Sequence, residues 1–582
     1  MIRALFLAVL FSSASALAAD PNVYNPADVK PGQKAYGLTV FVGDKVERFE
    51  LVLLGTLKNF LGPQKDLVVA KIEDPKLQLA GVVAGMSGSP IYVDGKILGA
   101  LGYSMGAFMK EGICGITPIE SMREVLDLPA IDPFGVPAQK PAGKPQAAVE
   151  GYAQQMIPMA SPLSVSGVDP RLLDHFMPSF ERAGYIAAPG GSAGGATKGV
   201  PRKLEAGGAI GAQLVRGDLS IASTGTITSV DGDKVLAFGH PFLGTGASSI
   251  PMANARVITI IASLQRSFKL SEIGEEVGCF TQDRLTAIAG ETGKKAAVIP
   301  VSVEIATQPE GRKNRYSFEV ARDPRLTPEL IQLVLANAMM RRTDAGVAGT
   351  VELSGELELT NGDKYPLSAL LAMERDPMLP LFAAMSVSRP FDLLWRNDYG
   401  SPLVKSVKVS VTLEREIRRM HVEWASLVRT THKPGDTVGI EVGVKPDDQP
   451  EKTLSIELSL PDSTEPGDYE ILIGGAGEAN GNEFRNFGFL RPQNKESLVA
   501  AMKSIRPDGP LYAQLTGKGG SVRVGEALLS DVPLSYATQI SPRDPDSRSQ
   551  RSPGSLLQET KKSVGAMIYG EARLPLKVRP KR

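Results

Sequence analysis

The sequence predicts a mainly β protein divided into several domains. Glycine and proline are frequent, with 60 and 43 residues among 582, and both favour turns over long helices. Short apolar runs end repeatedly at turn-forming pairs such as Asp94-Gly95 and Asn361-Gly362, which join neighbouring strands. The chain is also too long for a single hydrophobic core, so roughly three to five domains are expected.

The N-terminus is typical of a secretory signal peptide at residues 1–19. Arg3 supplies a positive charge, the following residues through Phe11 are apolar, and Ala16-Leu17-Ala18 offers a cleavage site between small residues. A buried N-terminal helix is the alternative interpretation. No later stretch has the ~18 consecutive apolar residues that a membrane helix needs. We therefore expect an exported protein, periplasmic or secreted, with no transmembrane segment after signal removal.

Composition narrows the classes of partner and cofactor. Lysine and arginine together number 64, as do aspartate and glutamate. This balance gives no excess of positive charge that would indicate binding to nucleic acid or to an anionic membrane surface. Two cysteines and four histidines without close spacing argue against a metal site, and no motif indicates a cofactor. In an oxidising compartment Cys114 and Cys279 could pair, but two separate buried thiols fit the sequence equally well.

Residues 31–129 predict a compact β unit of about six strands closed by a short helix. Two apolar runs meet at Gly43-Asp44, a hairpin signal, and a further strand over Asp66–Ile72 ends at Glu73-Asp74-Pro75. The helix is expected from Pro118 through Leu126. This unit is the size of one barrel.

A tight corner, Gly85-Met86-Ser87-Gly88-Ser89-Pro90, lies inside this unit between two extended runs. Glycine permits unusual backbone angles and leaves room for a substrate carbonyl. The corner therefore suits Ser87 as a nucleophile, with an oxyanion hole made by the N–H groups of Gly85 and Ser87. Ser89 is a fallback nucleophile, and an ordinary Ser/Gly loop between two strands is the alternative interpretation.

A second β unit follows a linker. Residues 130–200 are rich in proline, glycine and alanine and predict a linker, interrupted by a short helix with Asp169 as its cap and Pro170 in its first turn. Residues 201–305 return to alternating strands, and one of these strands ends at Gly239-His240-Pro241. From the residues alone, His240 suits either a catalytic or a structural role.

Three further units complete the expected organisation. Residues 306–403 predict an α+β extension, with a helix whose apolar face carries Leu330 and Val334 and is interrupted by Asn337. Residues 404–490 predict an immunoglobulin-like sandwich from short alternating strands and Pro-Gly-Asp turns, a module able to bind an envelope partner. Residues 491–582 predict a C-terminal module with one helix and a charged loop.

Two segments together resemble a known family. The run from Asp74-Pro75 through the Gly85–Pro90 corner to Asp94-Gly95-Lys96 resembles the SpoIVB peptidase family of serine endopeptidases, and the end of the serine barrel in chymotrypsin-like proteases. Ala237-Phe238-Gly239-His240 and the later strand-turn-strand over Gly278–Gly290 resemble the histidine half of that family. The resemblance implies a chymotrypsin-like double β-barrel whose halves stand in permuted order, which an active site between two barrels tolerates.

The resemblance also implies roles for residues. Ser87 is the nucleophile, His240 the general base and Asp74 the orienting acid of a Ser-His-Asp mechanism. Asp74 suits a turn role too, and Asp233 and Asp283 are reserve candidates for the acid. The expected function is that of an exported serine endopeptidase with a regulatory or processing role, acting on protein or peptide substrates. One form of this hypothesis includes cleavage of its own chain. The alternative is a catalytically silent binding or scaffold protein with a protease-like fold.

Overall fold

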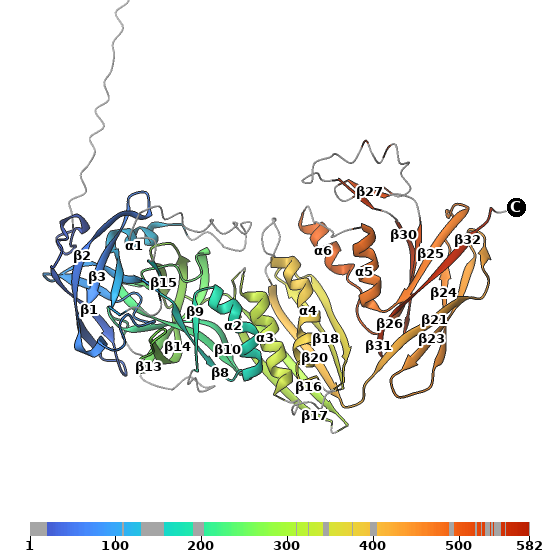
Figure 1. Cartoon of the computed structure of the whole chain (residues 1–582), viewed down its shortest axis with the longest axis horizontal. Coiled ribbons are helices and arrows are strands. Elements are labelled where there is room, and N and C mark those ends of the chain that lie inside the picture. Colours follow the sequence, from blue (N-terminus) through green and yellow to red (C-terminus); the bar gives the residue numbers. More distant parts are fainter. Residues whose placement is uncertain are drawn as a thin grey trace, which may run out of the picture.

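The computed structural model describes residues 20–580, apart from 107–109, 130–155, 190–202, 310, 324, 342–348, 375, 396–403, 488–493, 518–520, 525–526, 530–535, 537–538, 540–548 and 553–554. Strands dominate the described residues, which confirms the mainly β prediction. The elements follow one another along the long axis of the molecule, from the blue first barrel to the red C-terminal strands (Figure 1). The predicted signal peptide and much of the predicted linker lie outside the described residues.

Six strands of the first β unit form a closed ring in the order β4-β1-β2-β3-β6-β5, because β5 pairs back onto β4. The predicted hairpin residues join β4 to β5, where Asp94 and Gly95 both take positive φ, as a tight two-residue turn requires. A short helix, α1, follows the last strand. The elements are β1 (Lys34–Val40), β2 (Val46–Gly62), β3 (Lys65–Ile72), β4 (Pro90–Val93), β5 (Lys96–Ser104), β6 (Ile113–Pro118) and α1 (Ile119–Arg123).

Six strands of the second β unit close into another ring, in the order β10-β13-β14-β15-β12-β11, with β11 pairing back onto β10. Two closed six-stranded rings confirm the predicted double-barrel fold. The strands are β10 (Ala209–Gly217), β11 (Ser220–Asp231), β12 (Lys234–Ala237), β13 (Gly246–Ile261), β14 (Phe268–Asp283) and β15 (Ile288–Thr292).

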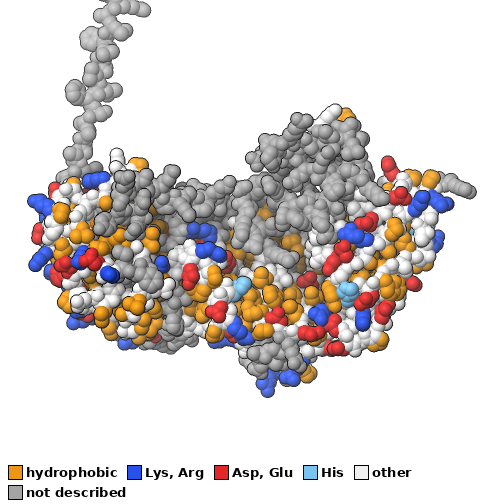
Figure 2. Space-filling model, viewed as in Figure 1, with side chains coloured by type: hydrophobic (Ala, Val, Ile, Leu, Met, Phe, Trp, Pro, Cys, Tyr) orange, Lys and Arg blue, Asp and Glu red, His pale blue; other side chains and the backbone are white. Residues whose placement is uncertain are grey.

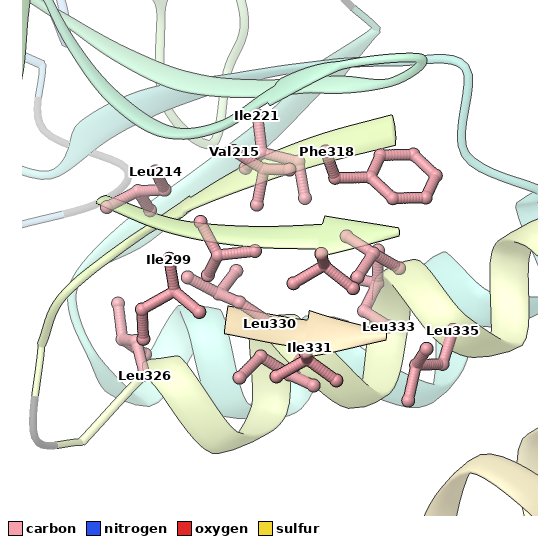
Figure 3. Packing of buried hydrophobic residues seen from close by; sticks show 14 of the residues in the cluster. Leu214, Val215, Ile221, Ile299, Phe318, Leu326, Leu330, Ile331, Leu333 and Leu335 are labelled. Carbon is pink, nitrogen blue, oxygen red and sulfur yellow. The ribbon is translucent and has the colours of Figure 1, made fainter. Parts of the chain in front are cut away.

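The sheet of the second barrel continues at both ends to thirteen strands. Figure 3 shows the core that this extension shares with α3, where Leu330 and Leu333 lie near Ile299 of β16 and Phe318 of β17. The added elements are β8 (Ser161–Ser166), α2 (Pro170–Arg182), β9 (Tyr185–Pro189), β16 (Val298–Gln308), β17 (Arg312–Ala321), α3 (Thr327–Met340), β18 (Thr350–Leu359), β19 (Lys364–Ala372), α4 (Leu379–Trp395) and β20 (Val404–Glu414).

The two helices predicted here form as expected. Asp169 caps α2 by accepting a hydrogen bond from the Arg171 N–H. Asn337, the polar residue on α3, donates through Nδ2 to the Gly167 carbonyl and accepts from the Asp169 N–H. The amide that interrupts the apolar face therefore fixes the start of α2 against α3.

The C-terminal strands form two main sheets, of four and five strands, and a small sheet of three. One core lies between the main sheets, with Val438 and Ile440 from one and Ile471 and Leu511 from the other. Since strands beyond residue 491 complete both sheets, the predicted sandwich and C-terminal module share that core; the immunoglobulin-like identity stays a prediction. The elements are β21 (Arg419–Leu427), β22 (Thr431–His432), β23 (Thr437–Pro446), β24 (Lys452–Ser459), β25 (Gly467–Gly474), α5 (Ala476–Phe487), α6 (Lys495–Lys503), β26 (Pro510–Gly517), β27 (Ser521–Val524), β28 (Ala527–Leu529), β29 (Ser549–Ser552), β30 (Ser555–Ser563), β31 (Met567–Tyr569) and β32 (Glu571–Val578).

Charged side chains of both signs are interspersed over the face seen in Figure 2, and no single sign dominates it. This mixture is what the balanced composition predicts. Among the helices of the described residues, none combines the length and the apolar character needed to cross a bilayer.

Candidate active site between the barrels

The Gly85–Pro90 corner of the first barrel is held by β11 of the second. The Thr226 N–H donates to the Ser87 carbonyl at 2.8 Å, and the Thr226 hydroxyl donates to the Gly85 carbonyl at 2.9 Å. The Thr228 hydroxyl donates to the Gly88 carbonyl at 2.8 Å. Two threonines from a distant part of the chain therefore fix the backbone on both sides of Ser87.

The strand end that carries His240 packs directly against this corner. A Cβ added to Gly88 would lie 2.0 Å from the Thr226 carbonyl oxygen and 2.4 Å from the Phe238 nitrogen. The Leu101 carbonyl, which accepts from the Gly88 N–H at 2.7 Å, would also lie 3.0 Å from a Cβ on Gly239. The fold thus brings together the two segments that the sequence predicts to be catalytic.

The backbone before His240 adopts an unusual conformation. Phe238 has φ +68° and Gly239 has φ +65°, and the left-handed region is costly for a bulky residue such as phenylalanine. Phe238 is fully buried, with its ring edge-on to those of His240, Phe242 and Phe280. This packing holds the sharp bend that delivers His240 to the barrel interface.

Ser87 and His240 are both buried, with exposed fractions of 0% and 2%. Within the part of the chain that the structure describes, neither the Ser87 Oγ nor the His240 Nε2 has a hydrogen-bond partner. A buried polar atom without a partner costs ~1–3 kcal/mol, so two at one interface call for an explanation. The two atoms do not form a hydrogen bond with each other in this structure, and the catalytic roles of Ser87 and His240 stay predictions.

The tautomer of His240 follows from its second ring nitrogen. Nδ1 lies 2.8 Å from the Pro241 carbonyl oxygen, and because a carbonyl only accepts, Nδ1 carries the proton and Nε2 the lone pair. Burial lowers the pKa of the imidazole to about 4. The ring is therefore neutral at pH 7, in the form that a general base requires.

Backbone N–H groups in the corner divide into two sets. The N–H groups of Met86, Gly88 and Ser89 donate to the carbonyls of Val83, Leu101 and Met86. The N–H groups of Gly85 and Ser87 have no acceptor among the residues that the structure describes. The two free donors are those that the sequence predicts for an oxyanion hole.

Asp74 lies at the start of a short 3-10 helix, and both of its carboxylate oxygens accept hydrogen bonds from backbone N–H groups. Oδ1 accepts from the Lys76 N–H at 2.8 Å, and Oδ2 accepts from the Glu50 N–H at 3.2 Å. Asp74 therefore has the arrangement of a helix cap. The acceptor of the His240 Nδ1–H is the Pro241 carbonyl and not Asp74. The role of Asp74 as the orienting acid stays a prediction.

Asp283, a reserve candidate for the acid, holds the loop that follows His240. Its carboxylate accepts from the N–H groups of Phe242, Leu243 and Gly244 at 2.8, 2.6 and 2.7 Å. Burial raises its pKa to about 6, although these three hydrogen bonds act in the opposite direction. The other reserve candidate, Asp233, lies at the turn before β12 and accepts from the Thr292 hydroxyl at 3.2 Å.

A hollow of about 570 Å³ opens beside the corner, and it is lined by the first barrel and by residues 263–267 of the loop between β13 and β14. Its lining includes Asp74, Ala84 and Met105 but neither Ser87 nor His240. Residues Ile157–Pro158 form β7, which pairs antiparallel with the end of β5 at this hollow. The edge of β5 beside the corner is therefore paired with an extended segment of the chain itself.

Each barrel carries one buried, free cysteine, Cys114 in the first and Cys279 in the second. Burial raises the pKa of the Cys114 thiol to about 12, so it stays protonated and unreactive at neutral pH. Of the two alternatives left open by the sequence, the structure contains separate thiols.

Residues 12–119 match the family model of the SpoIVB peptidase S55. The match covers Asp74 and Ser87 and ends before the histidine barrel, so the histidine half rests on its own residues. No curated protein matches the chain, and no solved structure matches it.

Proposed function

Because the serine-bearing part of this chain is related to the SpoIVB serine peptidases, we propose that the protein is a serine endopeptidase. Ser87 is the nucleophile and His240 the general base. The observation that supports this assignment is the pair of buried, unpartnered atoms, Ser87 Oγ and His240 Nε2, on two segments that pack against each other through Gly88 and Phe238.

The chemistry is acyl transfer in two steps. His240 Nε2 takes the proton of Ser87 as its Oγ attacks the substrate carbonyl, and the N–H groups of Gly85 and Ser87 stabilise the oxyanion. The imidazolium then protonates the leaving amine, and water hydrolyses the acyl-enzyme by the reverse route. Since both side chains are buried, elements that cover them move apart for a substrate to enter.

The substrate is a protein or peptide bound in extended form. Support comes from β7, an extended segment of this chain that pairs with Tyr103 and Ser104 of β5, in the way that a bound peptide adds as a strand to a sheet edge. We further propose export to the periplasm, from the pattern of residues 1–19, a regulatory or processing role, and an envelope partner for the C-terminal sandwich.

Labelling with a fluorophosphonate probe tests the nucleophile. We expect stoichiometric labelling of the folded protein and complete loss in Ser87→Ala. Ser89→Ala is the matched control, because Ser89 Oγ is also buried and unpartnered, and this variant should keep the label. Mass spectrometry of the labelled peptide identifies the site. Label on Ser89, or on no serine of the corner, would contradict the proposal.

A catalytically silent binding or scaffold protein is the second candidate. The observation that favours it is the complete burial of Ser87, with no hydrogen bond to His240 in the described structure. A folded, full-length protein that resists the probe at all concentrations and under peptide addition would support this alternative.

Asp74→Asn separates two ways of orienting His240. Asparagine still caps the 3-10 helix but carries no charge, so we expect the labelling rate to stay within about tenfold of the original, because the Pro241 carbonyl holds Nδ1. A triad aspartate replaced in this way loses ~10⁴-fold in rate. A loss of that size, with an unchanged unfolding midpoint, would restore Asp74 as the acid.

A further inference from the structure

We propose that Lys269 is a positioning residue for the serine corner, holding the oxyanion-hole glycine through Thr226. This inference rests on the proposed function, since it concerns the same site. Lys269 is the second residue of β14, and its side chain belongs to neither the nucleophile nor the base described above.

Lys269 is fully buried where strands of both barrels meet. Its Nζ donates to the hydroxyls of Thr39 on β1 and Thr226 on β11, at 2.7 and 3.4 Å. Within the described residues no carboxylate forms an ion pair with it. Burial of an uncompensated ammonium costs several kcal/mol, and this burial lowers the pKa of the amine to about 7. Perturbed, desolvated groups of this kind gather at functional sites.

A chain of hydrogen bonds connects this amine to the corner. Lys269 Nζ donates to the Thr226 hydroxyl, which in turn donates to the Gly85 carbonyl at 2.9 Å. The aliphatic part of the lysine also packs on the glycine, because its Cβ and Cδ would each lie 3.2 Å from a Cβ on Gly85. The side chain thus fixes the peptide that follows Gly85.

The main chain of Lys269 fixes the preceding peptide. Its N–H donates to the Ala84 carbonyl at 2.9 Å. In a trans peptide the C=O and the N–H point in opposite directions, so the Gly85 N–H points away from β14. Lys269 therefore holds both peptides of Gly85, whose N–H is one of the two free donors of the corner. Preorganised donors of this kind act on the transition state more than on substrate binding.

Three variants test this role in the full-length protein. Lys269→Met keeps the length of the side chain and removes the amine, while Thr226→Val removes the hydroxyl that bridges to Gly85. Thr39→Val is the matched control, because it removes the other acceptor of Nζ and leaves the bridge to Gly85 in place. The saturation kinetics of fluorophosphonate labelling yield a limiting rate and a half-saturation concentration, and thermal unfolding is measured alongside.

We expect Lys269→Met and Thr226→Val to lower the limiting rate by about 10- to 100-fold, the scale of a disturbed oxyanion donor, with half-saturation changed less than threefold. The double variant should be no slower than the slower single variant, since both act through one chain of bonds. Thr39→Val should stay within about threefold. Lys269→Met should unfold at the same or a higher temperature, because an apolar side chain replaces a buried ammonium.

Two outcomes would overturn the inference alone: an unchanged limiting rate in folded Lys269→Met, or a loss that merely follows the folded fraction. Labelling that is abolished in Lys269→Met but retained in His240→Ala would make Lys269 the base, and would overturn both the inference and the assignment of His240. If the unaltered folded protein is never labelled, the proposed function fails and the inference falls with it.

Discussion

Gly88→Ala is expected to undock the two barrels and abolish labelling of Ser87. The new Cβ would lie 2.0 Å from the Thr226 carbonyl oxygen and 2.4 Å from the Phe238 nitrogen, and neither backbone atom can rotate away. Gly88 also has φ +94°, which strains any other residue. We expect a loss of more than ~4 kcal/mol in the free energy of unfolding, measured by denaturant titration.

Gly95→Ala is the matched control for this change. Gly95 has φ +79° and nothing within 4 Å of a built Cβ, so its replacement reports the cost of the backbone angle alone, ~1–2 kcal/mol. It should keep both the fold and the label. Equal destabilisation of the two variants would mean that the serine corner and the histidine strand are not closely packed in solution.

The sequence predicts the local features of the site well. Asp94-Gly95, the corner glycines and the Asp169 cap each act over a few residues, so their types alone indicate the backbone that they form. The two closed barrels follow from the resemblance of two separate segments to one family. The sequence cannot indicate which glycine meets another strand, because the close approach at Gly88 depends on Phe238 and Thr226, which lie far along the chain.

Lys269 and Asp283 illustrate the same limit for polar residues. Lys269 occupies an inward position of β14, in line with Ser271 and Ile273, so strand alternation was a signal available in the sequence. Lysine usually lies at the surface, however, and its burial follows only from the docking of both barrels. The sequence offers Asp283 as a candidate for the acid, whereas its three backbone partners lie in the loop after His240, a contact that no local pattern indicates.

The second large effect is expected at His240. His240→Gln should slow labelling of Ser87 by about 10³- to 10⁴-fold, because the amide can still donate to the Pro241 carbonyl but cannot take a proton from Ser87. In the unaltered protein the labelling rate of Ser87 should be constant from about pH 5 to 8. On the acid side it should fall only near pH 4, where the buried imidazole becomes protonated. A rate that falls with an apparent pKa near 6.5 would mean that the imidazole is solvated when the reaction occurs.

The lowered pKa of His240 also predicts how the stability of the fold depends on pH, in the direction opposite to that expected from Asp283. An exposed histidine has a pKa of ~6.5, so between about pH 6.5 and pH 4 the unfolded chain binds a proton at His240 that the folded protein does not. Stability from this group is therefore lost as the pH falls through that window. Asp283, with its raised pKa of about 6, instead loses its contribution to stability as the pH rises.

The difference in unfolding midpoint between the unaltered protein and His240→Gln isolates the contribution of the histidine, because Asp283 is common to both. That difference should move in favour of the glutamine variant as the pH falls from about 6.5 to 4; a constant difference would show that His240 is not held in its neutral form by burial between the barrels.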